Sequence, residues 1–220
     1  MKDLGYATTF GYLTESGLSD IMNRFAELES TTPEEFTHKK CLHDLGSGHG
    51  HVLFYAAKNY PNLRSIKGVE MDTDKYNIFQ NLLAHGNEVV NTSAIDCSRI
   101  ENSVGDMFAD STDISKSNII YISNLCFGDE MNKKLVKKLS DCMSPKRPTY
   151  VFCSRELNLN TTPNIQCKYM HKVPCKQSWM NGSNMNLYKL VKLAKPQKSK
   201  TLKKSKKKQG KKGNKTIKSD

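Results

Sequence analysis

Two acidic residues and a glycine-rich turn are the part of this sequence best suited to chemistry. The stretch Asp44-Leu45-Gly46-Ser47-Gly48 follows a short apolar run, and Glu70 ends the next apolar run. Glycines let a backbone approach a ligand closely, and an acid at the end of the second strand can accept hydrogen bonds from ribose hydroxyls. The layout therefore predicts a nucleotide-binding strand–helix–strand unit.

Asp44 distinguishes between two kinds of nucleotide cofactor. In dinucleotide-binding folds a pyrophosphate rests on the N-terminus of the helix that follows the turn. An acid at position 44 repels a pyrophosphate and attracts a cationic amino-acid group. The turn thus favours S-adenosylmethionine over NAD.

A second group of candidate residues follows the apolar run 118–123. In open α/β sheets the functional groups lie beyond the carboxyl ends of the strands. Asn124 offers an amide oxygen that can accept a hydrogen bond from a nitrogen nucleophile, and Phe127 offers an aromatic wall for an alkylamine. Taken alone, the two residues fit a turn asparagine and a core phenylalanine somewhat better than a functional site, but the glycine turn upstream favours the functional interpretation.

The elements that must position these residues alternate between strands and helices. Hydrophobic spacing and capping residues predict helices at 18–28, from 32 onward, and at 50–59, 72–83 and 129–143. Strands are expected at 40–45, 66–70, 89–95, 118–123, 149–154, 166–173 and 185–193. A turn at Asn181-Gly182 joins the last two strands without a helix. This order predicts a Rossmann-like α/β fold, with a seven-stranded, mostly parallel sheet and an antiparallel terminal hairpin.

The motifs and their order resemble the non-SET histone-lysine methyltransferases of the "disruptor of telomeric silencing" (Dot) type. The resemblance covers most of residues 8–193 and rests on five short segments: Phe10-Gly11-Tyr12, Asp44 to Gly48, Gly68-Val69-Glu70, Ser123 to Gly128, and Ser178-Trp179. This sequence departs from the family pattern in two of them. Tyr12 replaces a loop acid, and Ser123 replaces the first of two asparagines.

The resemblance implies a Rossmann-like class I methyltransferase and a role for each motif. The donor, S-adenosylmethionine, would contact the following residues: Phe10, Gly11, Tyr12, Asp44, Gly46, Gly48, His51, Glu70, Asp96, Cys97 and Asn124. Asp96 would face the adenine amino group, and Cys97 stands where an aromatic ring often stacks on adenine. Asn124 would also lie between the donor and the target lysine, with Phe127 and Trp179 lining the lysine channel. No metal is implied, because the six histidines are mostly isolated.

The implied activity is methylation of a lysine in a nucleosomal histone, at position seventy-nine on the core face of histone H3. Two alternatives remain open at this stage. One is a methyltransferase of RNA or of a non-histone protein. The other is a non-catalytic module that binds nucleic acid and keeps a vestigial pocket.

Charge divides the chain into a domain, residues 1–194, and a tail, residues 195–220. The tail contains 12 lysines and one acid, which account for +11 of the formal net charge of +12 and leave +1 for the domain. Such a tail cannot fold alone, and it suits the phosphates of nucleosomal DNA. We therefore expect a monomeric protein of the nucleus, or of another chromatin-containing compartment.

The sequence gives no sign of a membrane segment or of a cysteine framework. No apolar run approaches the roughly 20 residues of a membrane span. The seven cysteines include no CxxC pair, which favours reduced thiols over disulfides or a zinc site.

Overall fold

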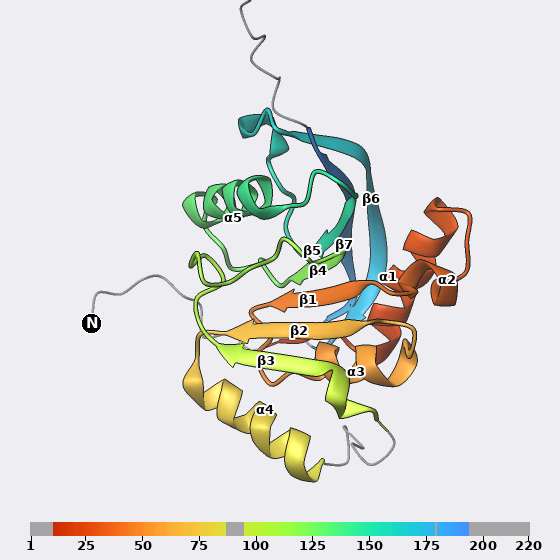
Figure 1. The fold of residues 1–220 in the computed structure, drawn as a ribbon, viewed down its shortest axis with the longest axis vertical. Helices are drawn as coiled ribbons and strands as arrows, with labels where there is room; N and C mark the ends of the chain where they lie inside the picture. Colours follow the sequence, from red (N-terminus) through yellow and green to blue (C-terminus); the bar gives the residue numbers. More distant parts are fainter. Residues whose placement is uncertain (1–10, 87–94, 179, 194–220) are drawn as a thin grey trace, which may run out of the picture.

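One seven-stranded sheet organises the protein. The computed structural model describes residues 11–86, 95–178 and 180–193, and its strands lie in the order β3-β2-β1-β4-β5-β7-β6 (Figure 1). They are β1 Cys41–Leu45, β2 Ser65–Glu70, β3 Ile100–Val104, β4 Ile119–Ile122, β5 Thr149–Cys153, β6 Ile165–Gln177 and β7 Met180–Lys192. The first five are parallel, and β7 is antiparallel to both of its neighbours. The predicted fold class, with its antiparallel terminal hairpin, is confirmed.

Five α-helices lie in the described ranges, and three of them begin at a capping side chain. They are α1 Glu15–Leu28, α2 Pro33–Thr37, α3 His51–Asn59, α4 Thr73–His85 and α5 Asp129–Cys142, with short 3-10 turns at Cys97–Arg99 and Leu159–Thr161. Thr14 caps α1, Thr32 forms a capping box with Glu35 at α2, and Asp72 caps α4. None of the helices in the described ranges has the length and apolarity to cross a bilayer.

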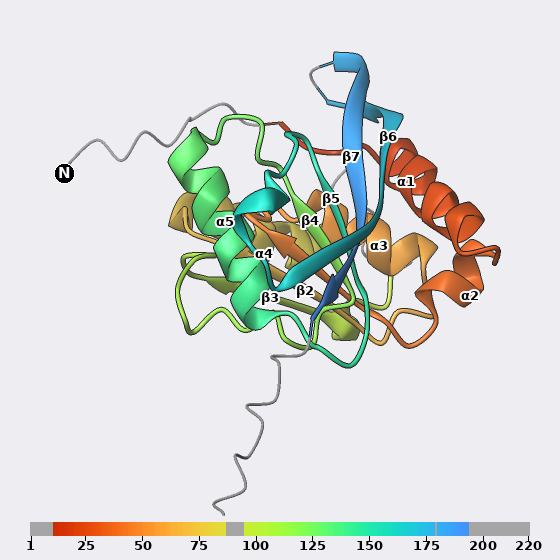
Figure 2. The ribbon, with the colours of Figure 1, turned by 90° about the horizontal axis from the view of Figure 1, so that it is seen from above.

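Helices cover both faces of the sheet. The first three helices lie on one side and α5 lies on the other (Figure 2). The central strand β4 is buried on both faces: Ile119 and Tyr121 pack with the α1–α3 layer, whereas Ile120 and Ile122 pack with α5. This double burial explains the continuous apolar run of β4, which is typical of a parallel strand inside a sheet.

The edge strand next to β2 differs from the prediction. β3 pairs with β2 through residues 100–104, whereas the strand expected at 89–95 lies mostly outside the described residues. Edge strands need little apolar character on their solvent side, and in β3 the side chains of Glu101, Ser103 and Val104 are exposed. The strand beside β2 is therefore formed by a more polar segment, which the sequence analysis did not select.

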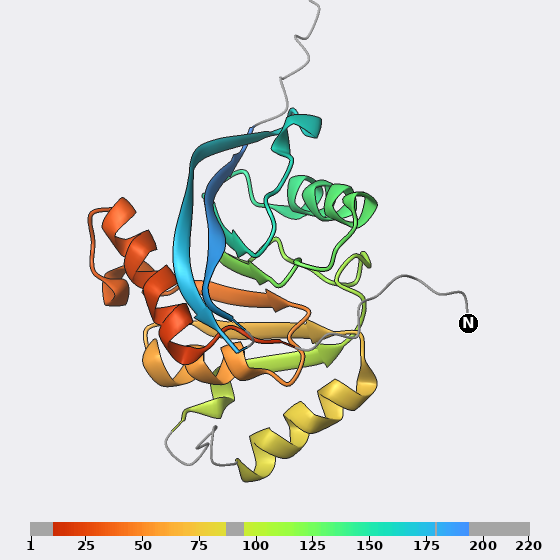
Figure 3. The same cartoon turned by 180° about the vertical axis from the view of Figure 1, so that it is seen from behind.

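The terminal hairpin is longer than expected and turns earlier. Gln177 pairs with Met180, so Asn181 and Gly182 lie within β7 rather than in the turn. Helix α1 packs against β6 and so covers one face of the hairpin (Figure 3). The hairpin thereby brings residue 178 close to the start of the described chain.

A buried histidine in β1 makes the fold sensitive to acid. His43 is 5 % exposed, its Nδ1 lies 3.1 Å from the Ser117 hydroxyl, and burial lowers its pKa from 6.5 to about 4. Between about pH 6.5 and pH 4 the unfolded chain binds a proton at His43 more readily than the folded chain does. The free energy of unfolding therefore decreases as the pH falls through this range. We expect His43 to contribute a loss of about 2 kcal/mol in the free energy of unfolding between about pH 7 and pH 5.

Urea unfolding at the two pH values measures this loss, and His43→Gln should make it smaller. His85→Gln, at an exposed position on α4, serves as the matched control and should leave the pH dependence unchanged. Equal pH dependence in wild type and His43→Gln would contradict the prediction.

Candidate active site

The glycine turn after β1 is held against the end of β2. Gly46 and Gly48 have φ values of 91° and 55°, which residues other than glycine rarely adopt. The backbone N–H groups of Gly46 and Ser47 donate to the Val69 carbonyl at 2.9 and 3.0 Å, and the Gly48 N–H donates to Glu70 Oε2 at 2.7 Å. The turn and the second acid therefore form one unit, as the sequence predicted.

Asp44 lies buried beneath this turn without a partner in the described part of the chain. The residue is 2 % exposed, and its Oδ1 atom accepts no hydrogen bond. Burial, together with the neighbouring Glu70, raises the pKa of Asp44 well above its usual value. Because an unpaired buried carboxylate is costly, this position favours a ligand that brings a cationic group.

A pocket opens above Asp44, and the early loop forms one of its walls. Its lining includes Gly11, Tyr12, Asp44, Gly46, Gly48, His51, Glu70, Lys75, Tyr121 and Ser123. Seven of the predicted donor contacts, Glu70 among them, thus meet in one cavity. Phe10, which was also predicted, lies outside the described residues.

Contacts across the fold hold the early loop in place. The Tyr12 ring stacks on the His51 ring with centroids 4.0 Å apart and an interplanar angle of 9°. The Tyr12 N–H donates to the Ser178 hydroxyl at 3.0 Å, and the Ser178 N–H donates to the Tyr12 carbonyl at 2.9 Å. Since Trp179 lies outside the described residues, its predicted role stays a prediction, although its neighbour Ser178 reaches the pocket loop.

Burial keeps His51 uncharged at the pocket wall. The side chain is 8 % exposed, and burial together with the nearby His49 lowers its pKa to about 4. At neutral pH the imidazole therefore adds no positive charge next to a cationic ligand. A neutral ring also packs face to face on Tyr12 without having to desolvate a charge.

Glu70 connects this pocket to a second one, which is more apolar. Glu70 accepts hydrogen bonds from the N–H groups of Gly48 and Asp72, at 2.7 and 2.8 Å, so its carboxylate is fixed at the boundary between the two pockets. The second pocket is lined by Gly46, Val69, Glu70, Met71, Asp72, Lys75, Gly105, Asp106, Met107, Phe108, Phe127 and Met131. A polar pocket joined to an apolar one suits a ligand with an amino-acid end and an adenosine end.

The structure corrects the predicted adenine contacts, Asp96 and Cys97. Asp96 precedes β3 and caps the 3-10 turn at Cys97–Arg99. Arg99 in turn donates to the carbonyls of Ala57 and Leu63, next to the end of α3, so this turn lies at the amino edge of the parallel strands. The donor pockets lie at the carboxyl edge, and the predicted contacts of Asp96 and Cys97 are therefore wrong.

Asp106 and Met107 occupy the place that Asp96 and Cys97 were expected to fill. They follow β3 directly and line the apolar pocket. Asp106 Oδ1 accepts the Phe108 N–H at 2.9 Å, which shapes the loop after the strand. The signal in the sequence was Gly105-Asp106 after the short, mostly polar run Ile100–Val104.

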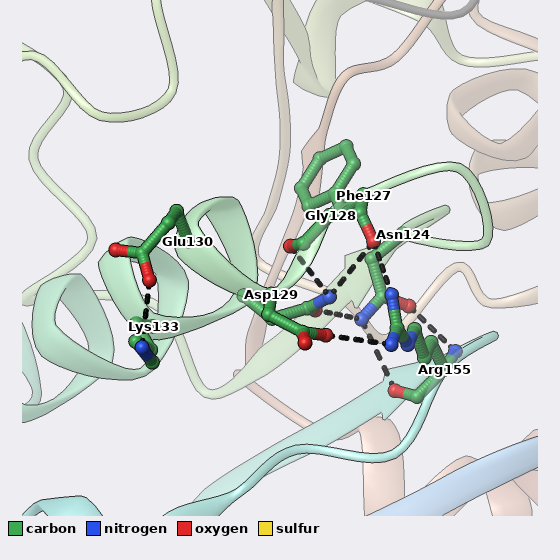
Figure 4. Close-up of polar contacts among 8 residues, drawn as sticks. Asn124, Phe127, Gly128, Asp129, Glu130, Lys133 and Arg155 are labelled. Carbon is green, nitrogen blue, oxygen red and sulfur yellow. Dashed lines mark hydrogen bonds and ion pairs between the residues drawn. The ribbon is translucent and has the colours of Figure 1, made fainter. Parts of the chain in front are cut away.

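Asn124 also differs from its prediction, because its amide is fully engaged inside the protein (Figure 4). It is 0 % exposed and does not line either pocket. Its Nδ2 donates to Asn132 Oδ1 at 2.8 Å and to the Arg155 carbonyl at 3.1 Å, and its Oδ1 accepts the Arg155 N–H at 2.7 Å. Asn124 therefore ties the loop after β4 to the loop after β5, and the neighbouring Ser123 lines the pocket above Asp44.

Phe127 lines the apolar pocket, and the same network holds its backbone. Its ring centroid lies 6.3 Å from that of Phe108, and its carbonyl accepts hydrogen bonds from Arg155 and Asn132. Arg155 also forms an ion pair with Asp129 at 2.8 Å (Figure 4). The predicted contact of Phe127 with a lysine side chain stays a prediction. Within the described ranges, no group of His, Cys, Asp and Glu side chains is arranged to hold a metal ion.

Comparison with protein families gives a match over most of the chain. Residues 9–179 match the family described as "Histone methylation protein DOT1". A search of curated proteins finds no match.

Solved structures share the fold at low sequence identity. An RNA methyltransferase from Salinibacter ruber, solved with S-adenosyl-L-homocysteine, is 18% identical over 82% of this chain and 94% of its own, with a TM-score of 0.51. TrmN from Thermus thermophilus is 14% identical over 80% of this chain and 48% of its own, with a TM-score of 0.55. The putative methyltransferase yhhF from Escherichia coli is 10% identical over 80% and 85%, with a TM-score of 0.55. At such identities the likeness shows the fold alone.

Proposed function

Because the chain belongs to the family of the histone methylation protein DOT1, and is thus an S-adenosylmethionine-dependent methyltransferase, we propose that its acceptor is a lysine side chain of a nucleosomal histone. The position that we propose is the core-face lysine seventy-nine of histone H3. The family match over residues 9–179 carries this proposal. Action on chromatin, and hence in the nucleus, is part of the same proposal.

The residues of the site fit the donor. The orphaned Asp44 carboxylate suits its ammonium, and Glu70 stands where a ribose would join the two pockets. Asp106, Met107 and Phe108 offer one polar group and apolar surface at the adenine end. When bound, S-adenosylmethionine supplies a methyl group already activated on a sulfonium.

The protein chiefly has to prepare and orient the amine. A lysine has a pKa of about 10.4, so its neutral form costs roughly 4–5 kcal/mol to populate at neutral pH. Removing water from the ammonium lowers this pKa. The stacked rings of Tyr12 and His51 and the buried Tyr121 are suited to exclude water beside Asp44, and the Ser123 hydroxyl can accept a hydrogen bond from the amine. Alignment and desolvation then carry the reaction without a dedicated general base.

Labelled donor incubated in parallel with nucleosomes, free histones and RNA tests the proposal. We expect label on histone H3 of the nucleosome, and its position is read by mass spectrometry of the H3 peptides. Label confined to RNA would overturn the proposed substrate. A protein that binds donor and transfers no label to any of the three would overturn the activity as well.

A further inference from the structure

Three lysines form an exposed stripe along the outer face of β6. They are Lys168, Lys172 and Lys176, which are spaced four residues apart. All three are exposed, as are Met170 and Pro174 between them. Alternate residues of a strand share a face, and the opposite face of β6 carries Tyr169, Val173 and Cys175, which pack into the core with α1. We refer to Lys168, Lys172 and Lys176 as the β6 lysine stripe.

Irregular pairing with β7 accompanies both ends of the stripe. The pairing with β7 shifts between Cys167 and Tyr169 and again between Cys175 and Gln177. Lys168 is therefore the extra residue of a bulge in β6, whereas at the second shift the extra residue lies in β7, opposite Lys176. A bulge leaves a residue outside the ladder and redirects its side chain, so the fold sets the direction of the Lys168 side chain at one end of the stripe.

No acid of the hairpin offsets this charge. Residues 165–192 contain five lysines and no Asp or Glu. Two of the five have other tasks: Lys189 pairs with Glu29 on the α1 side, and Lys192 donates to the Asp141 carbonyl. Within the stripe, only Lys172 has an ion pair in the described part of the chain, with Glu156 at 3.6 Å. Both of those side chains are more than half exposed, so the pair contributes little.

The stripe connects the active site with the basic tail. At one end the Lys176 carbonyl accepts hydrogen bonds from the backbone N–H and the hydroxyl of Thr14, next to the loop that walls the donor pocket. At the other end Ile165 pairs with Lys192, the last residue of β7. The 12 lysines of residues 195–220 follow from there in the sequence. Positive charge thus runs from the attachment point of the tail towards the pocket.

We propose that the β6 lysine stripe binds the phosphate backbone of a nucleic-acid duplex, which for the proposed substrate is nucleosomal DNA. The partner identity rests on the proposed function, whereas the binding chemistry rests on the stripe itself. Eight residues of strand span about 27 Å, the length of about eight base pairs. Lysines make point-charge contacts with phosphates, so the stripe orients the duplex beside the pocket without reading its sequence.

Fluorescence anisotropy with a labelled DNA duplex, across a series of salt concentrations, tests the stripe in the full chain. The variant Lys168→Gln/Lys172→Gln/Lys176→Gln should bind about 10-fold more weakly at about 0.1 M salt. Loss of three phosphate contacts should also make the slope of log affinity against log salt shallower by about 2 to 3. Unchanged binding of S-adenosyl-L-homocysteine shows that the variant is folded.

A charge-matched variant separates position from net charge. Lys39, Lys116 and Lys146 are exposed in the loops that precede β1, β4 and β5, at the edge of the sheet opposite the donor pocket. Changing these three to Gln removes the same charge and should leave the slope near that of the wild type. Equal slopes in the two triple variants, or an unchanged slope in the stripe variant, would overturn the proposal.

The same preparations distinguish this proposal from the proposed function. A stripe-dependent slope in a protein that labels only free RNA would overturn the histone substrate and support the stripe. If nucleosomal H3 is labelled but the slope of log affinity against log salt is the same in the stripe variant as in the wild type, the histone substrate is supported and binding by the stripe is overturned.

Discussion

Replacing Asp44 with Asn should weaken donor binding by about 100-fold while making the unliganded protein more stable. The substitution keeps the size of the side chain and removes the negative charge of a carboxylate that has no hydrogen-bond partner at Oδ1 in the described part of the chain. A buried charge-assisted hydrogen bond is worth about 2–3 kcal/mol, which corresponds to this loss of affinity. Isothermal titration with S-adenosyl-L-homocysteine measures it.

The gain in stability follows from the direction of the pKa shift. Burial raises the pKa of Asp44, so the folded protein holds the proton more tightly than the unfolded chain. A group with a raised pKa destabilises the folded state progressively as the pH rises above its unfolded value. Removing the ionisable group therefore raises the melting temperature at neutral pH, whereas Asp20→Asn, at an exposed site on α1, should change neither property. A less stable Asp44→Asn protein, or one with unchanged donor affinity, would show that Asp44 has a different role.

The features that sequence alone predicted well are local ones. The glycine turn requires left-handed backbone at Gly46 and Gly48, and that requirement is visible in the residue types themselves. Glu70 is the last residue of β2, in which Ile66, Gly68 and Val69 are buried. Both also lie at the ends of parallel strands inside the sheet, whose residues are mostly buried.

The features that sequence missed depend on partners far along the chain. The edge strand β3 has one neighbour and an exposed side, so its residues carry a weaker signal than the apolar segment before it, and the error carried Asp96 to the wrong edge of the sheet. The Asn181-Gly182 pair has strong turn character, yet the register of the hairpin places it inside β7. In both cases tertiary pairing overrides local preference.

The adjacent residues Ser123 and Asn124 show the same limit at the catalytic end of β4. Their order in the family motif favoured the asparagine, but alternation along the strand and the backbone of Arg155, 31 residues away, decide which side chain meets the pocket. Substitutions of Ser123 and Asn124 should therefore affect different properties, kcat in the first case and stability in the second.

Asn124→Ala should destabilise the protein by about 2–4 kcal/mol. The change removes three hydrogen bonds at a fully buried position and leaves Asn132 Oδ1 and both backbone groups of Arg155 without that partner. Each unsatisfied buried group costs about 1–3 kcal/mol, although partial relaxation reduces the sum. Denaturant unfolding measures the loss, and the methyltransferase activity of this variant should fall largely because the loops after β4 and β5 separate.

Ser123→Ala should behave in the opposite way, with little change in stability and a kcat lower by about 10-fold. Its hydroxyl lines the pocket, so its loss removes an acceptor that orients the amine and spares the packing below. Ser123→Thr keeps the hydroxyl and should restore most of the kcat, which a purely structural role would not require. If instead Asn124→Ala keeps wild-type stability and loses only kcat, the buried amide acts on the substrate itself and does not stabilise the contact between the loops after β4 and β5.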